Sequence, residues 1–396
     1  MLQTQIIGCG AAGGKCVAQF IKDGVILEDN CLIVNSTIQD KPDCNCKFIN
    51  IGKNNDLGGA AKEPSKGKQM CIEALQGEFT ETLQSFVKPT TKKVYIVTSL
   101  EGGTGCGSSV IIAQFMKQVM GQNVHIIAIT GFEDDPRGLK NTIQFFQQID
   151  PDYTVSIISN KKFLKDANND KLKAEQLCNR EISTLISVLN GQMIVASSKN
   201  IDDNDLYKLS TKSGYMNISY AQVDERIRNT EQFNSFIKDM IDNSKSMDLV
   251  DPKQTTLGII INLPEDEQQY IDYSYKVLTD HYNSGDSTCY EVFTHIQHDS
   301  SKVNFIAFVN AGMQLPLEEV QRMYDNYSSL KAKSEIEARE KKNQFFSGMN
   351  AIVFDDDDDN DLKESSSTKS ANDFLASLTG GQVKSNNSSN KLDNNF

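Results

Sequence analysis

The sequence predicts an α/β protein with a doubly wound parallel sheet, a long central helix, a smaller α+β domain, a long C-terminal helix and a disordered acidic tail. Three observations lead to this prediction. Short continuous apolar runs alternate with helical patterns up to about residue 160, a long helical pattern follows, and three strand-like runs come late with few helices between them. Continuous apolar strands separated by helices are typical of a parallel sheet covered on both faces.

Five apolar runs form the expected parallel sheet: QTQIIGC, CLIVNS, KVYIVTSL, NVHIIAITGF and YTVSIIS. Each run precedes a polar or glycine-rich turn. Ligands of such sheets bind at the carboxyl ends of the strands. We therefore expect a binding site at the loops that follow Ile7, Val34, Leu100, Thr130 and Ser159.

The helical pattern from Asp170 to Ser197 repeats apolar residues at three- and four-residue spacing, which predicts a buried connector helix. After it we expect a helix at Tyr220 to Asn243, a helix at Glu265 to Tyr282, and strands at TTLGIIINL, CYEVFTHIQ and VNFIAFVNA. One charged helix from Leu317 to Phe346 follows, and then a tail with little to bury. The predicted domain boundaries are 1–169, 170–199, 200–315, 316–353 and 354–396.

Composition limits the partners and the compartment. With 396 residues and a net charge of −13, the chain is long enough for two or three domains and poorly suited to bare DNA, because phosphate neutralisation needs clustered Lys and Arg. No apolar run reaches the ~18–20 residues that cross a bilayer, so we expect a cytoplasmic protein with no membrane partner. Nine cysteines, an odd number, with four histidines and no C-x-x-C favour reduced thiols over a zinc site.

The first glycine-rich loop, from Gly8 to Lys15, reads GCGAAGGK and contains a literal G-x-G-x-x-G. As a dinucleotide fingerprint it lacks the acid that should hold a ribose after the second strand, where Asn35 to Thr37 read NST. As a Walker A loop it also fails, because Cys16 follows the lysine. By itself this loop leaves open whether it binds a nucleotide or is an ordinary turn.

The second loop, EGGTGCGSS at 101–109, lies between an apolar strand and a helix expected to begin near Ser108. Backbone N–H groups of such a loop and the positive end of the helix dipole converge on one spot, which makes an anion site. The loop carries no lysine, so backbone amides and a metal ion would have to meet the charge of a phosphate. Two strand–glycine–helix loops in one sheet, neither of them a Walker A loop, leave few classes of phosphate-containing ligand to consider.

These residues resemble the tubulin/FtsZ superfamily, whose signature is a G-G-G-T-G-[ST]-G loop. Glu101 and Cys106 depart from that signature, and the first loop, the NST stretch and GGAAKEPSKGK at 58–68 resemble other loops of the family, so the resemblance covers roughly residues 1 to 320. It implies GTP or GDP as the ligand, with Mg²⁺ held mainly by phosphates and water. The phosphate-binding residues that it implies are Gly8, Gly10, Ala11, Gly13, Gly14, Lys15, Asn35, Gly59, Ala60, Ala61, Gly102, Gly103, Thr104, Gly105, Cys106 and Gly107.

The stretch SKNIDDNDLYKL at 198–209 resembles the family's N-x-D-x-x-D segment, with Asn200, Asp202 and Asp205 in register. The resemblance implies that this segment enters the pocket of the next subunit, where a carboxylate orients or polarises the water that attacks the γ-phosphate. Phosphoryl transfer needs positioning and charge stabilisation more than covalent chemistry, which fits such a site. The alternative is an acidic N-cap at a solvated helix start.

The resemblance also implies contacts with the base and the ribose. Asn179, in QLCNREI, matches the family's guanine-reading asparagine, whose amide can both donate and accept, and the alternative is an ordinary polar helix position. Asn160 resembles an asparagine near the base. The aromatic residue that often stacks on the base would fall at Glu175, which is a departure from the family. The candidates for the ribose contacts are Asp134, Asp135 and Arg137.

The long C-terminal helix and the acidic tail depart from cell-division FtsZ and resemble the divergent plasmid and phage branch, such as TubZ. The main hypothesis is a GTP-hydrolysing, filament-forming protein that segregates or positions plasmid or phage DNA, with its catalytic site completed between subunits. Its partners would be further copies of the chain and a DNA-binding adaptor, possibly held by the tail. The alternatives are a cell-division ring protein, a GTP-binding protein that does not polymerise, and an NAD-dependent oxidoreductase that uses the first loop.

Overall fold

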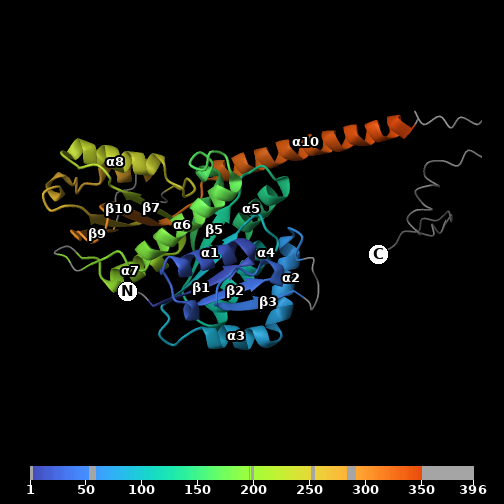
Figure 1. The fold of residues 1–396 in the computed structure, drawn as a ribbon, viewed down its shortest axis with the longest axis horizontal. Helices are drawn as coiled ribbons and strands as arrows, with labels where there is room; N and C mark the ends of the chain where they lie inside the picture. The colour runs from blue at the N-terminus through green and yellow to red at the C-terminus, as the bar shows by residue number, and fades with distance from the viewer. Residues whose placement is uncertain are drawn as a thin grey trace, which may run out of the picture. The chain divides into compact units, whose positions relative to one another are not determined.

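A mixed sheet of ten strands runs through the described part of the chain, which comprises residues 3–52, 59–195, 197, 200–250, 255–282 and 291–349 in this computed structural model (Figure 1). The predicted tail, 354–396, lies outside these residues. The strands are β1 Thr4–Cys9, β2 Cys31–Asn35, β3 Lys47–Asn50, β4 Lys93–Ser99, β5 Val124–Thr130, β6 Thr154–Ser159, β7 Gly214–Gln222, β8 Thr256–Asn262, β9 Glu291–Gln297 and β10 Phe305–Met313. Their order in the sheet is β3-β2-β1-β4-β5-β6-β7-β10-β8-β9.

The parallel part of the sheet runs from β3 to β7, with β1 in its interior. From β1 the chain moves outward through β2 and β3 on one side, and then through β4, β5 and β6 on the other. The direction reverses between β1 and β4, and ligands of open α/β sheets bind at such a reversal. The predicted doubly wound fold class is confirmed.

The late strands continue the same sheet. β7 pairs in parallel with β6 and antiparallel with β10, while β8 and β9 complete the far edge. The described residues up to Glu337 form one compact unit, and the end of the last helix, from Ala338 onward, belongs to a second unit. The domain boundaries at 170, 200, 316 and 354 stay predictions.

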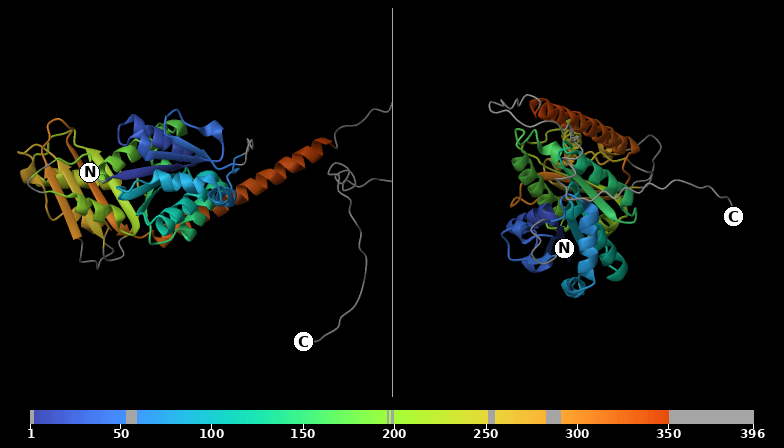
Figure 2. Two further views of the ribbon diagram at one scale, coloured as in Figure 1. Left: turned by 90° about the horizontal axis from the view of Figure 1, so that it is seen from below. Right: turned by 90° about the vertical axis from the view of Figure 1, so that its right-hand side faces the viewer.

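Helices cover both faces of the sheet (Figure 2). α1 Gly10–Lys22 and α6 Lys171–Leu189 pack on one face, and α3 Glu78–Phe86, α4 Thr104–Gln114 and α5 Pro136–Gln148 pack on the other. Successive strand residues point to opposite faces, so Ile6 belongs to the first core and Ile7 to the second. The remaining helices are α2 Pro64–Leu75, α7 Asp203–Thr211, α8 Thr230–Asp242, α9 Lys276–Tyr282 and α10 Leu317–Met349.

Two helices differ from their predicted bounds because of their neighbours in the chain. α6 ends at Leu189 and does not continue to Ser197, because Gly191 takes a left-handed φ of 71°, a conformation that ends helices. α8 begins at Thr230 and not at Tyr220. The residues before it form β7, which pairs with β10 as far as Gln222.

The helix predicted from Glu265 is also shorter, since α9 begins only at Lys276. The carboxylate of Asp272 accepts hydrogen bonds from the backbone N–H and the hydroxyl of Ser274. Such a local turn competes with helical hydrogen bonding. α10, in contrast, begins at Leu317 as predicted.

Within the described residues, no helix has the length and apolarity that a membrane crossing needs. The described cysteines are free thiols, and no cluster of three or more His, Cys, Asp or Glu side chains in this part of the chain could hold a metal ion.

Backbones approach closely where the two glycine-rich segments begin α1 and α4. A Cβ atom on Gly13 would lie 2.3 Å from the carbonyl oxygen of Val97, and one on Gly105 would lie 2.7 Å from that of Cys9. α4 begins at Thr104, earlier than predicted, so the last glycines of the second segment belong to its first turn. Side chains at these positions would force the helices away from the strands.

We expect Gly13→Ala to lower the free energy of unfolding by about 1–3 kcal/mol, because the added methyl group meets backbone that cannot move aside. Ala has a better helix propensity than Gly by about 1 kcal/mol, but the steric cost of its methyl group is larger than this gain. Denaturant unfolding measures the change. Gly77→Ala is the control, since its Cβ would meet no atom nearer than 3.7 Å. Equal destabilisation of both variants would contradict a special role for the contact at Gly13.

Candidate nucleotide site

The carboxyl ends of β1, β2, β4, β5 and β6 line one pocket of about 420 Å³. Pockets that hold small ligands have volumes of ~300–1,000 Å³. The pocket wall contains ten of the residues predicted from the sequence: Gly10, Ala11, Lys15, Asn35, Gly102, Gly103, Thr104, Gly105, Asn160 and Asn179. Asp40, Lys62, Glu101, Phe132 and Glu175 also contribute to it.

The two glycine-rich segments meet at this pocket. Gly10 has a left-handed φ of 73°, and a Cβ atom on it would lie 2.8 Å from the backbone nitrogen of Gly105. A Cβ on Gly102 would meet no atom within 4 Å, so this residue borders open space. Because α1 and α4 both begin here, their unpaired N–H groups and their positive dipole ends lie at the same pocket, as an anion site requires.

Two buried side-chain atoms of the wall have no hydrogen-bond partner among the described residues: Asn35 Nδ2 and Asn160 Oδ1. Leaving a buried polar atom unpaired costs about 1–3 kcal/mol. A donor and an acceptor are therefore free to bind a polar ligand. The other polar atom of the Asn35 amide, Oδ1, accepts a hydrogen bond from the backbone N–H of Ser36 at 2.8 Å.

The α6 side of the wall carries Asn179 and, one turn earlier, Glu175. The oxygen of Asn179 accepts a hydrogen bond from the thiol of Cys16 at 3.0 Å, which links α6 to α1. Glu175 lies 3.7 Å from the ammonium group of Lys15. An ion pair thus occupies the position at which an aromatic side chain would stack on a base. The roles predicted for Asn179 and Asn160 in base contact stay predictions.

Several predicted phosphate residues lie outside this pocket wall. Gly8, Gly13 and Gly14 lie where α1 packs on the strands, and Gly59 and Ala60 contact the loops around the pocket. Three more, together with Arg137, line a neighbouring pocket of about 660 Å³ between α2, α4 and α5: Ala61, Cys106 and Gly107. Burial raises the pKa of the Cys106 thiol to about 12, so this thiol is no nucleophile at neutral pH.

The acids predicted to contact the ribose do not line the nucleotide pocket either. Asp134 forms an ion pair with Lys171. Asp135 caps α5 and lies 2.6 Å from the ammonium group of Lys62. Their predicted contact with a ribose stays a prediction, without support from the shape of the pocket.

Glu101 is a member of the wall to which sequence reasoning assigned no role. Its carboxyl group fills space that Gly131 and Gly138 leave open, because a Cβ on Gly131 would lie 1.8 Å from it and one on Gly138 would lie 2.8 Å from it. Burial, together with the charges of Asp135 and Asp134, raises the pKa of Glu101 to about 7. The departure from the family signature at Glu101 was the one signal of this arrangement.

The predicted catalytic segment lies at the amino ends of the parallel strands, whereas the pocket lies at their carboxyl ends. Lys93, the first residue of β4, donates to the carbonyl oxygen of Ser210 in α7 at 3.4 Å. Asn123, just before β5, donates to the hydroxyl of Tyr207 in α7 at 2.6 Å. α7 therefore packs at the amino ends of strands whose carboxyl ends form the pocket, and six- or seven-residue strands span about 20 Å. It does not reach the pocket of its own chain.

The start of α7 is held by a capping box. Oδ1 of Asp202 accepts from the backbone N–H groups of Asn204 and Asp205, and Oδ2 of Asp205 accepts from the N–H of Asp202 at 3.2 Å. Oδ1 of Asn200 accepts from the N–H of Ser197 at 2.8 Å. The acidic N-cap that was the alternative reading is thus present. The catalytic role of these residues stays a prediction.

Comparison with known proteins supports the resemblance. No family model matches the sequence. Cell division protein FtsZ 1 of Methanocaldococcus jannaschii is 25% identical over 223 residues, which are 55% of this chain and 54% of that protein. The match spans about half the length of this curated relative.

Solved structures match this chain over more of its length than the curated relative does. A GTPγS-form protofilament of TubZ from Bacillus thuringiensis serovar israelensis gives a TM-score of 0.70 at 15% identity, covering 87% of this chain and 94% of that one. The chain therefore has the same fold as this TubZ. TubZ of the Clostridium botulinum phage c-st gives 0.62 at 15% identity, covering 84% of this chain and 98% of that one. These matches confirm the fold that the predicted family implies.

We expect Glu101→Gln to make the protein more stable than the wild type at pH 8, by about 1–3 kcal/mol, and to change little at pH 5. The pKa of Glu101 is raised to about 7 in the fold, so the wild type loses stability as pH rises from the ordinary value of 4.5 toward 7. Denaturant unfolding at the two pH values measures this. Glu81→Gln on the exposed side of α3 is the control and should give no such difference. A variant that is less stable at pH 8 would contradict the assigned cause.

Proposed function

We propose that the chain binds and hydrolyses GTP and assembles head to tail into filaments, with each active site completed by α7 of the next subunit. The observation that carries this proposal is the placement of pocket and α7 at opposite ends of one sheet. In a head-to-tail stack, the α7 end of one copy faces the pocket end of the next. The protofilament form of the Bacillus thuringiensis TubZ supports it.

Binding of the phosphates would use backbone N–H groups at the starts of α1 and α4, which meet at Gly10 and Gly105. Asn35 Nδ2 would donate to a phosphate oxygen, and the asparagines at 160 and 179 would contact the base or the ribose. The residues present fit such a ligand, because the starts of α1 and α4, with their unpaired N–H groups, and Asn35, with its unpaired Nδ2, all belong to the wall of one pocket. Mg²⁺, held by the phosphates and water, would supply charge neutralisation.

Hydrolysis would depend on the carboxylates of Asp202 and Asp205 in the neighbouring subunit, which would orient the attacking water. Asp202 is exposed and Asp205 is partly exposed, so both are accessible to an incoming pocket. Hydrolysis should therefore depend on assembly, because a single copy lacks half of the catalytic groups.

Among the other functions, a cell-division role receives support from the FtsZ relative, which is a cell division protein. The TubZ structures, one of them from a phage, support the resemblance to the plasmid and phage branch. We propose DNA positioning as the cellular role, with an adaptor as the link to the DNA, because the net charge of −13 disfavours direct contact with phosphates. A GTP-binding protein that does not polymerise would not explain why the acidic start of α7 lies away from the pocket of its own chain. An oxidoreductase would leave the second glycine segment unexplained.

We expect Asp202→Asn to lower GTP hydrolysis by about 100-fold or more, since it removes a water-orienting carboxylate. Asn caps a helix as well as Asp does, so α7 should remain folded. Phosphate release with GTP and Mg²⁺ measures activity, and sedimentation measures assembly. The variant should still sediment, and Asp203→Asn in the same turn is the matched control.

Dilution of the wild type tests the completion of the site between subunits. Phosphate release per subunit should fall steeply below the concentration at which filaments form. A rate per subunit that stays constant on dilution would show that one copy holds the whole active site.

We also expect the purified chain to give no shift of linear DNA in a gel at physiological salt, since like charges repel. The same result is expected for a chain cut after residue 353, because the adaptor and not the tail would contact DNA. Salt-sensitive DNA binding by either form would contradict the proposed indirect link.

A further inference from the structure

Glu133 lies directly after two residues of the pocket wall, Gly131 and Phe132. It is not a glycine, yet its φ is 61°, a left-handed conformation that such residues keep only when their surroundings impose it. Its side chain is buried. Burial alone would raise the pKa of Glu133, but hydrogen bonds and charge from Arg322 and Lys161 override it and lower the pKa to about 2.

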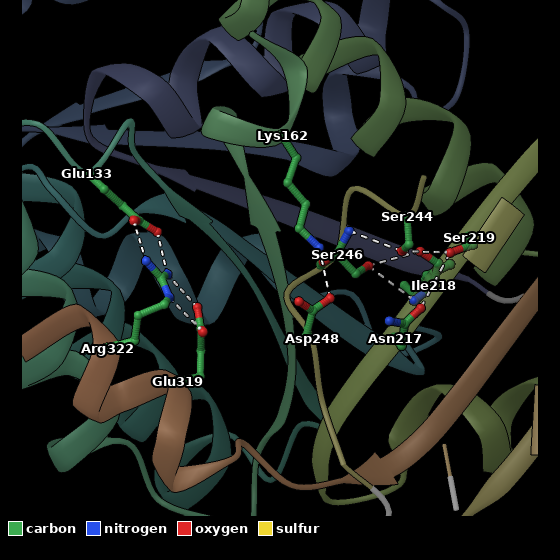
Figure 3. A network of polar contacts seen from close by, with 10 residues as sticks. All are labelled: Glu133, Lys162, Asn217, Ile218, Ser219, Ser244, Ser246, Asp248, Glu319 and Arg322. Atoms are coloured by element: carbon green, nitrogen blue, oxygen red, sulfur yellow. Dashed lines mark hydrogen bonds and ion pairs between the residues drawn. The ribbon is translucent and has the colours of Figure 1, made fainter. Parts of the chain in front are cut away.

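Two residues of α10, Arg322 and Asn326, bind Glu133. Figure 3 shows the contact of Arg322. Arg322 donates from both terminal nitrogens to the two carboxylate oxygens, each at 2.8 Å. Glu319, one turn earlier on α10, accepts from the same guanidinium group at 2.6 and 2.9 Å and so fixes its plane. Asn326 donates to the backbone carbonyl oxygen of Glu133 at 3.0 Å. α10 thus binds both the carboxylate and the carbonyl group of this residue.

On the inner side, Glu133 is connected to the pocket by three routes. Its backbone follows Phe132 of the wall. Its carboxylate accepts from Lys161 at 2.8 Å, and Lys161 follows Asn160 of the wall. Its backbone N–H lowers the pKa of the carboxyl group of Glu101, which also lines the pocket. The carboxylate of Glu133 is therefore bound both by α10 and by a neighbour of the pocket, and its carbonyl oxygen is bound by α10.

We propose that Arg322 is a positioning residue that couples the docking of α10 to nucleotide binding, because it holds Glu133 and with it one wall of the pocket. The inference rests on the proposed function, that this pocket binds GTP. A guanidinium group presents two parallel N–H groups to a carboxylate, and an ammonium group cannot. Coupling of this kind is reciprocal, so bound nucleotide stabilises the docking of α10 as much as α10 favours the nucleotide.

The test is the affinity of the full-length chain for a fluorescent GTP analogue, measured below the assembly concentration, together with the thermal midpoint. Arg322→Gln should weaken binding about 5- to 50-fold, and Arg322→Lys should recover only part of it. Lys331→Gln, on the exposed side of the same helix, is the matched control and should bind like the wild type. Glu319→Gln, which leaves the contact with Glu133 in place, should have the smaller effect.

A second variant separates positioning from stability. Glycine adopts a left-handed φ without strain, so in a Glu133→Gly background the loop should keep its conformation without α10. Adding Arg322→Gln to Glu133→Gly should then change affinity less than twofold, although it changes affinity strongly in the wild type. A structural role of Arg322 alone would lower the thermal midpoint and leave the affinity unchanged.

The outcomes are distinct. A folded Arg322→Gln variant that binds the analogue within twofold of the wild type overturns the coupling and leaves the proposed function intact. Equal losses of affinity in the wild-type and Glu133→Gly backgrounds overturn it as well, because the effect would not pass through residue 133. A wild type that binds no GTP overturns the proposed function and this inference with it.

Discussion

The pocket depends on backbones that touch with no side chain between them. α1 and α4 begin at the carboxyl ends of adjacent strands, and at Gly10 and Gly105 a single added carbon would approach the opposite backbone to within 3 Å. The same holds where α1 crosses β4 at Gly13. Because the two helix starts are this close, their unpaired N–H groups border one space and can bind one chain of phosphates. Larger residues would separate the donors into two weaker sites.

The parallel half of the fold could be predicted because its signals are local. Continuous apolar runs mark strands buried on both faces, and glycines mark the places where helices start against them. The second half was less predictable. Whether the residues before Gln222 form a helix or a strand is decided by β10, which lies about eighty residues later and pairs Phe305 with Gln222. No pattern within the segment itself records that partner.

The site shows the same division between local and distant information. Glycines and asparagines of the site were predicted from the glycine-rich loops and from the family resemblance, and ten of the predicted residues line the pocket. The acids after β5 were assigned to the ribose, but Lys62 and Lys171, from distant segments, hold them as ion pairs. Glu101 received no role in the sequence prediction, because the residues that make room for its carboxyl group are also distant in the sequence. Its place is made by Gly131, in the loop after β5, and by Gly138, in the first turn of α5, and only the fold brings these glycines to its carboxyl group.

The two readings of the acidic segment at α7 are compatible once the individual oxygens are considered. Asp202 uses Oδ1 for both capping bonds and Asp205 uses Oδ2, so these hydrogen bonds among the described residues engage one oxygen of each carboxylate. A carboxylate has about four acceptor positions, and the second oxygen remains free for water. The cap then fixes each carboxylate before a neighbouring pocket arrives, which spares reorganisation during the reaction. In the proposed filament, helix capping would be a condition of catalysis and not an alternative to it.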